Sequence, residues 1–298
     1  MAYALVLSSD VPDGNKTAQT FEKIINIFWP FFPAPVQVNF EEIDDGLFLY
    51  IITMPHPEIY RSKNRTGRKL TLKKWMSSID RNNIEHYLLE PLLKEYISGE
   101  WIRDENEYIA ESIRRNIHLL FASEPLKGLE LQTMTVTLSG AGKQYIRPNL
   151  ISVLRNFRMV NFIISDDVPE DTWDEFMAET GVPVCITDDL AVLSRSDVWI
   201  SYDKTDVDFP FDGIKISACA KNIVCPKHKK KYRIGYVFRR KLLKKLGTAL
   251  VQRFDNQLLA EFLLNMIIKR KGIPITEAEE LLGVRIAVLS AESQGLYS

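Results

Sequence analysis

Apolar residues recur at two spacings in the first part of the chain, and each spacing predicts a type of secondary structure. Apolar runs typical of strands lie at residues 3–8, 36–40 and 47–53. A helical spacing, with an apolar residue at every third or fourth position, covers residues 17–29. This βαββ order predicts that the chain opens with a mixed α/β domain, residues 1–125.

Two longer helical patterns follow, at residues 72–97 and 105–121. Asn82 and Asn83, near the middle of the first pattern, indicate that it can divide into two shorter helices. The basic stretch at residues 56–74 is expected to be a solvated loop that leads into the first of them. This part of the chain completes the predicted first domain.

The second half of the chain alternates strand and helix patterns at short intervals. Strands are expected at residues 131–138, 159–165, 184–187, 198–202 and 214–219, and helices at residues 148–157, 170–179 and 189–195. Such alternation demands a parallel sheet with right-handed crossovers. It predicts a Rossmann-like domain at residues 129–247, after a boundary segment at residues 122–128 that contains a proline and a glycine.

The longest helical pattern covers residues 248–270, and its apolar stripe is wide. The stripe contains Leu250, Phe254, Leu258, Phe262 and Met266, and is widened by Val251, Leu259, Leu263 and Ile267. Such a stripe needs cover on more than one side, so residues 248–298 are expected to return across the domain boundary to the first domain. Thr276 and Glu279 have capping-box spacing for a last helix, and residues 284–288 are expected to be an edge strand or coil.

The bulk composition is that of a soluble globular protein. Of 298 residues, 46% are hydrophobic and 26% are charged, and the formal net charge is −1. No apolar run approaches the roughly 18 residues of a membrane span, and the apolar amino terminus lacks the basic start of a signal peptide. Three cysteines, an odd number, argue against a disulfide framework. These features predict a cytoplasmic protein.

The small net charge conceals two segments of opposite sign. From Val160 to Gly213 there are fourteen acids and two bases, and from Lys221 to Lys245 there are eleven lysines and arginines and no acid. The two segments can face each other or the solvent. Alternatively, the basic segment binds an anion, which can be a phosphate, a nucleic acid or an acidic partner.

Aromatic residues lie between the basic ones, as nucleic-acid binding by base stacking requires. They are Tyr232, Tyr236 and Phe238. However, Ile234, Tyr236 and Phe238 also alternate as in a half-buried strand. The sequence therefore favours a solvated or phosphate-facing surface over a nucleic-acid interface.

The turn after the strand at residues 131–138 carries the most specific chemistry. There, glycines let backbone N–H groups approach a pyrophosphate, which the next helix attracts with its positive end. Gly140 and Gly142 match the first two glycines of G-x-G-x-x-G, and Asp166, 24 residues after Gly142, stands where an acid binds a ribose hydroxyl. The residues predicted to bind NAD or NADP are Ser139, Gly140, Ala141, Gly142 and Asp166.

The turn also departs from that fingerprint. Its third glycine is replaced by Tyr145, and the next helix is expected to begin only at Pro148. The alternative is a Rossmann-like sheet whose glycine turn holds no cofactor. If a dinucleotide binds, Asp166 and Asp167 favour NAD over NADP, unless Arg158 or the basic segment contacts a 2′-phosphate.

Three short motifs stand at similar places in known two-domain dehydrogenases. They are Gly-Ala-Gly at residues 140–142, Gly-Val-Pro-Val at residues 181–184 and Ser-Asp-Val-Trp-Ile-Ser at residues 196–201. With the α/β first domain and the returning helix, they resemble the shikimate/quinate dehydrogenase-like group, and glutamyl-tRNA reductase and methylene-tetrahydrofolate dehydrogenase have related layouts. The resemblance covers about residues 131–202 and implies a Rossmann fold with an NAD(P) cofactor.

That group uses a paired catalytic lysine and aspartate, which this sequence does not place. Four lysines of the first domain are candidates for the pair, and none stands in the group's motif: Lys63, Lys69, Lys73 and Lys74. No catalytic residue is therefore predicted. No metal site is predicted either, because Cys219, Cys225 and His228 lack both a standard zinc spacing and a local fourth ligand, and Cys185 stands elsewhere.

Two hypotheses about function follow. The first is an NAD(P)-binding protein that, as an enzyme, is an oxidoreductase acting on a small metabolite in the cleft between the domains. The second is a non-catalytic Rossmann-like binding or scaffold protein that uses the basic segment between Lys221 and Lys245 for an anionic partner. A homodimer is compatible with both.

Overall fold

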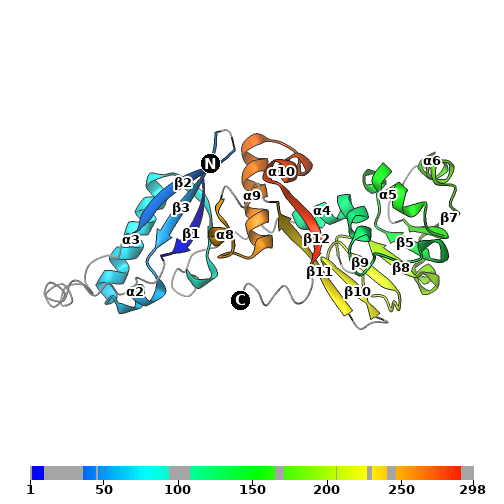
Figure 1. Ribbon diagram of the computed structural model, residues 1–298, viewed down its shortest axis with the longest axis horizontal. Coiled ribbons are helices and arrows are strands. Elements are labelled where there is room, and N and C mark those ends of the chain that lie inside the picture. The colour runs from blue at the N-terminus through cyan, green and yellow to red at the C-terminus, as the bar shows by residue number, and fades with distance from the viewer. Residues whose placement is uncertain are drawn as a thin grey trace. The chain divides into compact units, whose positions relative to one another are not determined.

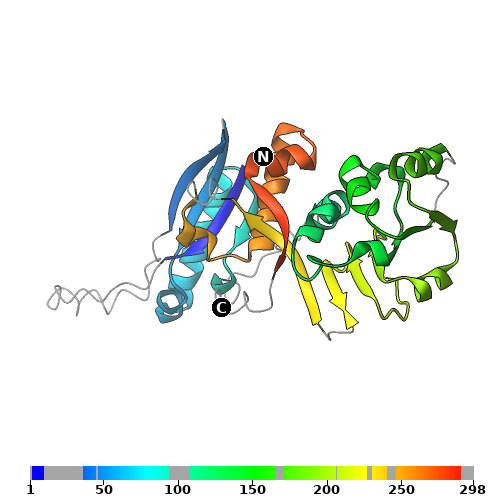
Figure 2. The same ribbon diagram turned by 45° about the vertical axis from the view of Figure 1, so that its right-hand side comes forward.

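The computed structural model describes residues 2–9, 36–44, 46–93, 108–164, 171–205, 207–226, 230–239 and 246–289. The chain is an α/β protein of two domains (Figures 1 and 2). The first compact unit contains Met1–Asn106 and Phe238–Gly283, and the second contains Glu107–Val237 and Val284–Ser298. Residues 122–128, where the sequence predicts a boundary, lie inside the second unit. The helix predicted at residues 17–29 lies outside the described residues.

The first unit is built on a mixed four-stranded sheet with the order β2-β3-β1-β4. Its strands are β1 (Ala2–Ser8), β2 (Gln37–Asp44), β3 (Leu47–Met54) and β4 (Ile84–Leu89). β1 pairs in parallel with β3 and β4, whereas β2 is antiparallel to β3. Because β1 lies in the centre, all of its residues are buried, which is why its sequence reads as an uninterrupted apolar run.

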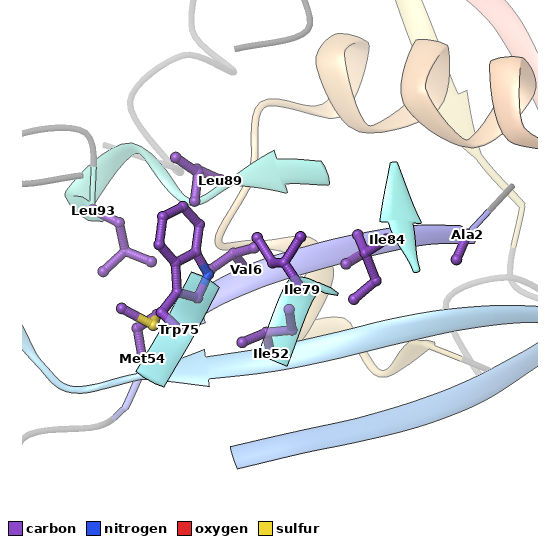
Figure 3. Packing of buried hydrophobic residues seen from close by; sticks show 10 residues of the cluster. Ala2, Val6, Ile52, Met54, Trp75, Ile79, Ile84, Leu89 and Leu93 are labelled. Atoms are coloured by element: carbon purple, nitrogen blue, oxygen red, sulfur yellow. The ribbon is translucent and has the colours of Figure 1, made fainter. Parts of the chain in front are cut away.

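The helices of the first unit come from both of its chain segments. They are α2 (Pro57–Ser62), α3 (Arg65–Arg81), the 3₁₀ helix η2 (Pro91–Leu93), α8 (Thr248–Val251), α9 (Asn256–Lys271) and α10 (Ile275–Leu282). On one face of the sheet, Trp75 and Ile79 of α3 pack against Val6 and Ile52 (Figure 3). Tyr3 points to the opposite side, where its ring meets Phe262 of α9 at 5.6 Å.

Two expectations for the first unit are wrong. The helix predicted at residues 72–97 begins at Arg65 and ends at Arg81, and Ile84–Leu89 form strand β4 instead. Asn83 has a φ of 49°, so the chain turns there and then pairs in parallel with β1. The predicted solvated loop at residues 56–74 is also largely helical, because Asn64 caps α3 by accepting a hydrogen bond from the Gly67 N–H.

The C-terminal helical region is also less continuous than the pattern predicts. The helix expected at residues 248–270 divides into α8 and α9, and the Asp255 side chain caps α9 through the Gln257 and Leu258 N–H groups. The predicted capping box at Thr276 is wrong as well. Pro274 is the N-cap of α10 and Thr276 lies inside that helix.

The second unit contains an eight-stranded, mostly parallel sheet with the order β12-β11-β10-β9-β8-β5-β6-β7. Its strands are β5 (Thr135–Ser139), β6 (Met159–Ile163), β7 (Val184–Thr187), β8 (Val198–Ser201), β9 (Ile214–Ser217), β10 (Asn222–Cys225), β11 (Lys230–Phe238) and β12 (Val284–Leu289). β5 to β9 pair in parallel, and β9, β10 and β11 form an antiparallel extension.

Both faces of the parallel part are covered. The helical elements of this unit are α4 (Tyr108–Asn116), η3 (Ile117–Ala122), η4 (Leu131–Thr133), η5 (Lys143–Tyr145), α5 (Pro148–Leu154), α6 (Asp171–Thr180) and η6 (Leu190–Arg195). Phe162 packs against Trp173 and Phe176 of α6. On the opposite face, Trp199 packs with Leu193 and Phe211. A sheet covered in this way explains the apolar runs that predict it.

The prediction of a parallel sheet therefore holds for β5 to β9 only. Residues 131–133, expected to begin the first strand, form the 3₁₀ helix η4, and the strand starts at Thr135. The basic segment supplies β10 and β11, and Ile234 and Tyr236 of β11 are buried. Residues 284–288, for which the sequence predicts an edge strand or coil, lie in strand β12 at the edge of this sheet.

Candidate functional site

The strand order of the second unit defines one edge of the sheet as the expected ligand-binding edge. The chain passes from β5 to β6 and β7 in one direction, and then returns to the other side of β5 to form β8. The carboxyl ends of β5 and β8 therefore lie at a topological switch point. In open α/β sheets, ligands bind in the crevice outside the carboxyl ends of the strands at such a point.

Four of the five predicted cofactor-binding residues lie at this point. Ser139 is the last residue of β5, and Gly140, Ala141 and Gly142 form the turn that follows it. Gly140 has a φ of 64°, a left-handed conformation that favours glycine. Asp166 lies outside the described residues. That these residues bind a cofactor stays a prediction.

Asp203, which the sequence reasoning missed, occupies the space beside the turn. A Cβ atom built on Gly140 would lie 2.5 Å from Asp203 Oδ1 and 2.9 Å from the Asp203 backbone nitrogen. Glycine is therefore required at residue 140 by a side chain of the protein itself. The sequence does contain a feature that could have identified Asp203. It is an acid two residues after the last residue of β8, and Asp166 likewise follows the end of β6.

Serine hydroxyls from both strands hold the Asp203 carboxylate. Ser139 Oγ donates to Asp203 Oδ2 at 2.5 Å, and Ser201 Oγ donates to the same oxygen at 3.0 Å. Ser139 and Ser201 are register partners, so their side chains point to the same face of the sheet. Trp199 Nε1 donates to Ser139 Oγ at 2.9 Å and completes the chain of hydrogen bonds.

A buried arginine fixes the backbone on which Asp203 stands. Arg114 of α4 is 6% exposed, and its Nε donates to the Tyr202 carbonyl oxygen at 2.9 Å. Its Nη2 lies 3.4 Å from the Asp203 carbonyl oxygen, and its Nη1 lies 3.9 Å from Glu111 Oε2. These contacts hold the segment after β8 in one position.

Tyr145 takes a different role from the third fingerprint glycine that it replaces. Its ring stacks on Tyr202 with centroids 5.3 Å apart, and its hydroxyl donates to Glu111 Oε2 at 3.0 Å. Burial and the nearby Glu111 carboxylate raise the pKa of Tyr145, so its hydroxyl stays protonated as the donor. Tyr145 therefore joins the turn to α4 within this unit.

The described residues do not form the pyrophosphate cradle of the dinucleotide fingerprint. A phosphate against Gly140 would lie beside the Asp203 carboxylate, and like charges 4 Å apart repel by about 4 kcal/mol at an effective dielectric of about 20. Helix α5 has only seven residues and begins with Pro148, which has no N–H to donate. The space next to Gly140 is therefore unfavourable for a diphosphate.

Other residues considered from the sequence lie elsewhere. Arg158 donates from Nη2 to Thr135 Oγ1 at 2.9 Å, at the amino end of β5, so it does not contact a 2′-phosphate at the carboxyl edge. In the first unit, Lys63 is buried, and burial lowers the pKa of its amine. Lys69, Lys73 and Lys74 are on α3.

The cysteines do not meet in a recognisable metal site. Cys185 is on β7, Cys225 is buried on β10, and burial raises the pKa of its thiol. Within the described ranges, no group of three or more histidine, cysteine, aspartate or glutamate side chains is placed to hold a metal ion. His228 lies outside them.

Among the described residues of the basic segment, several charged side chains are exposed and one aromatic ring is buried. Lys230, Lys231 and Arg233 of β11 are exposed. Tyr236 is 1% exposed, and its hydroxyl lies 2.6 Å from Ser112 Oγ of α4. A ring buried in this way cannot stack on a base, which weakens the nucleic-acid interpretation.

No helix in the part of the chain that the structure describes is long and apolar enough to cross a membrane. No protein-family model and no curated protein matches this sequence.

Solved structures share a distant likeness with the chain. L-tryptophan dehydrogenase from Nostoc punctiforme is 12% identical, with 95% of this chain and 78% of that chain covered and a TM-score of 0.29. An NAD-complexed D-isomer specific 2-hydroxyacid dehydrogenase from Lactobacillus delbrueckii ssp. bulgaricus is 13% identical over 70% and 63% of the chains, with a TM-score of 0.24. The catalytic subunit of M. jannaschii aspartate transcarbamoylase is 12% identical over 67% and 60%, with a TM-score of 0.20. Scores at this level assign no activity.

Proposed function

We propose that the second unit binds a nucleotide at the carboxyl edge of β5 and β8, and that NAD or NADP is the ligand class. The observation that carries this proposal is the reversal of strand order at β5, where the turn after Ser139 opens at the switch point. Ser139, Gly140, Ala141, Gly142 and Asp166 are the residues proposed to contact the ligand.

If the protein is an enzyme, the proposed reaction class is hydride transfer to or from a small metabolite. This part of the proposal rests on the cofactor class alone. The geometry of the described residues assigns no step of that reaction to a side chain. The first question for experiment is therefore binding.

Calorimetric titration of the full chain with NAD, NADH, NADP and NADPH tests the proposal. We expect micromolar-range affinity for one of these pairs, and we expect Gly142→Trp to abolish it. A Cβ atom on Gly142 would meet only the end of the flexible Gln144 side chain, at 2.5 Å, so the variant can fold with its indole in the turn. Ser152→Trp, at an exposed position of α5, is the control of equal bulk. Failure of all four nucleotides to bind the wild-type protein would refute the proposal.

A second candidate function is binding of an anionic partner through the basic segment. It is favoured by the exposure of Lys230, Lys231 and Arg233 on β11. Retention on heparin that weakens with salt, and is lost when Lys230 and Lys231 are changed to glutamine, would support it. Unchanged retention in that double variant would exclude this surface.

A further inference from the structure

We infer that Asp203 is a ligand-binding residue that accepts a hydrogen bond from a ribose hydroxyl of the nucleotide, and that it excludes phosphate from the space beside Gly140. This inference rests on the proposed nucleotide binding at the same edge. It places a ribose hydroxyl at the glycine turn after the first strand of the unit, where a diphosphate normally lies. The two oxygens of the Asp203 carboxylate have different surroundings.

The first oxygen, Oδ2, is already satisfied. Ser139 Oγ has one proton, and it must give that proton to Asp203, because the Trp199 indole N–H that also contacts it can only donate. Ser201 Oγ adds a second donor to the same oxygen. Both hydroxyls thus act as donors, and the carboxylate is an acceptor held in place.

The second oxygen, Oδ1, remains open to a ligand. Within the described residues it accepts no hydrogen bond. It packs against Gly140, but Asp203 is only half-buried, so this oxygen can still accept a hydrogen bond from a ligand. A carboxylate oxygen at a switch point binds groups that donate, and in a nucleotide these are the sugar hydroxyls and the amino groups of the bases; the ribose diol is the group inferred here, and 2′,3′-dideoxyadenosine distinguishes it from the base. A phosphate oxygen offers no proton there.

The donor groups of Arg114 are already engaged within the protein, so they do not bind a phosphate beside Gly140. Its Nε and Nη2 face the carbonyl oxygens of Tyr202 and Asp203, and its Nη1 faces Glu111. Its role is to position the backbone that carries Asp203. The carboxyl edge beside Gly140 therefore presents a hydrogen-bonded carboxylate, which suits a diol and not a diphosphate.

Binding measurements on wild type and Asp203→Asn test the inference. The probes are NAD, adenosine, 2′,3′-dideoxyadenosine and inorganic pyrophosphate. The wild-type protein should bind adenosine but not dideoxyadenosine or pyrophosphate. Asp203→Asn keeps the size of the side chain and removes its charge, so adenosine and NAD should bind roughly tenfold to a hundredfold more weakly, as expected for loss of a hydrogen bond to a charged group. Pyrophosphate affinity should rise.

Asp197→Asn is the matched control. Asp197 Oδ2 accepts from the Thr135 N–H at 2.8 Å, at the opposite end of β5, and an asparagine oxygen can keep that bond. Its nucleotide affinity should equal that of wild type. The Trp199 indole N–H resonance, identified from its loss in Trp199→Phe, should shift when adenosine is added, because Ser139 links this group to Asp203.

The outcomes separate the two proposals. If the wild-type protein binds none of the nucleotides, nucleotide binding fails and this inference fails with it. If nucleotides bind but Asp203→Asn leaves their affinity unchanged, or dideoxyadenosine binds as well as adenosine, only the inference about Asp203 is overturned. An unchanged affinity for pyrophosphate in Asp203→Asn would overturn the exclusion of phosphate by this carboxylate.

Discussion

The carboxylate of Asp203 fills the space that a side chain at Gly140 would need. The distance from a Cβ atom at residue 140 to Asp203 Oδ1 would be 2.5 Å, and the backbone at residue 140 is left-handed. Two independent constraints, a backbone conformation and a neighbouring side chain, therefore require glycine at the switch point of the second unit.

The first prediction separates these constraints. Gly140→Ala should lower the free energy of unfolding by more than the about 1–2 kcal/mol of a left-handed alanine, because Asp203 must also move. Gly181→Ala is the control, since its φ is 69° and nothing lies within 4 Å of an added Cβ. Urea denaturation measures both variants. Equal losses of unfolding free energy in the two variants would show that the contact with Asp203 adds nothing to the cost of Gly140→Ala.

The second prediction concerns the ion pair between Arg253 and Glu90 in the first unit. Arg253 Nε donates to Glu90 Oε1 at 2.9 Å and Nη2 donates to Oε2 at 2.9 Å, while Nη2 also reaches Ser8 Oγ at 2.6 Å. Arg253→Lys keeps the charge but loses the two parallel bonds, so the urea midpoint should fall.

Its control is an arginine that is similarly exposed but lies on a helix surface. Arg115 pairs with Glu111 one helical turn away on α4, and such pairs contribute about 0.3–0.5 kcal/mol. Arg115→Lys should therefore leave the midpoint nearly unchanged. A loss for Arg253→Lys no larger than that for Arg115→Lys would contradict the prediction.

The third prediction concerns the core shown in Figure 3. Trp75 is 3% exposed and packs between α3 and the sheet, with its ring 5.7 Å from Tyr87. Trp75→Ala should cost about 3–5 kcal/mol, because a large cavity remains. Met76→Ala, at the next and 48% exposed position of α3, should cost far less. Circular dichroism during urea denaturation compares the two variants, and similar midpoints would place Trp75 outside the core.

The fourth prediction is a pH dependence in the second unit. Burial lowers the pKa of His118 in η3 below its ordinary value of 6.5. The unfolded chain therefore binds more protons than the folded chain as pH falls through this range, so stability should decrease from pH 6.5 downward. His118→Gln cannot take up that proton and should show a smaller decrease. Urea midpoints of both proteins at about pH 7.5 and 5.5 test this. Equal decreases of the midpoint in wild type and His118→Gln would show that other groups cause the pH dependence.

Local patterns in the sequence were sufficient to predict the elements that are buried along their whole length. The runs that form β1, β5 and β8 are rich in apolar and β-branched residues because their strands lie inside sheets. The alternation after residue 129 predicted parallel pairing of β5 to β9. Pro148 was predicted as the start of the helix after the glycine turn, and α5 begins there. These features depend on neighbours along the chain.

The sequence by itself determined an α/β protein with strand and helix alternating in its second half, and it placed a glycine turn at the end of the first strand there. Only the tertiary structure decided that residues 84–89 pair with β1 as a strand, because that parallel pairing joins distant parts of the chain. Only the tertiary structure brought Asp203 from the end of β8 against Gly140 at the end of β5. Strand order sets which carboxyl ends are neighbours, and no local pattern encodes it.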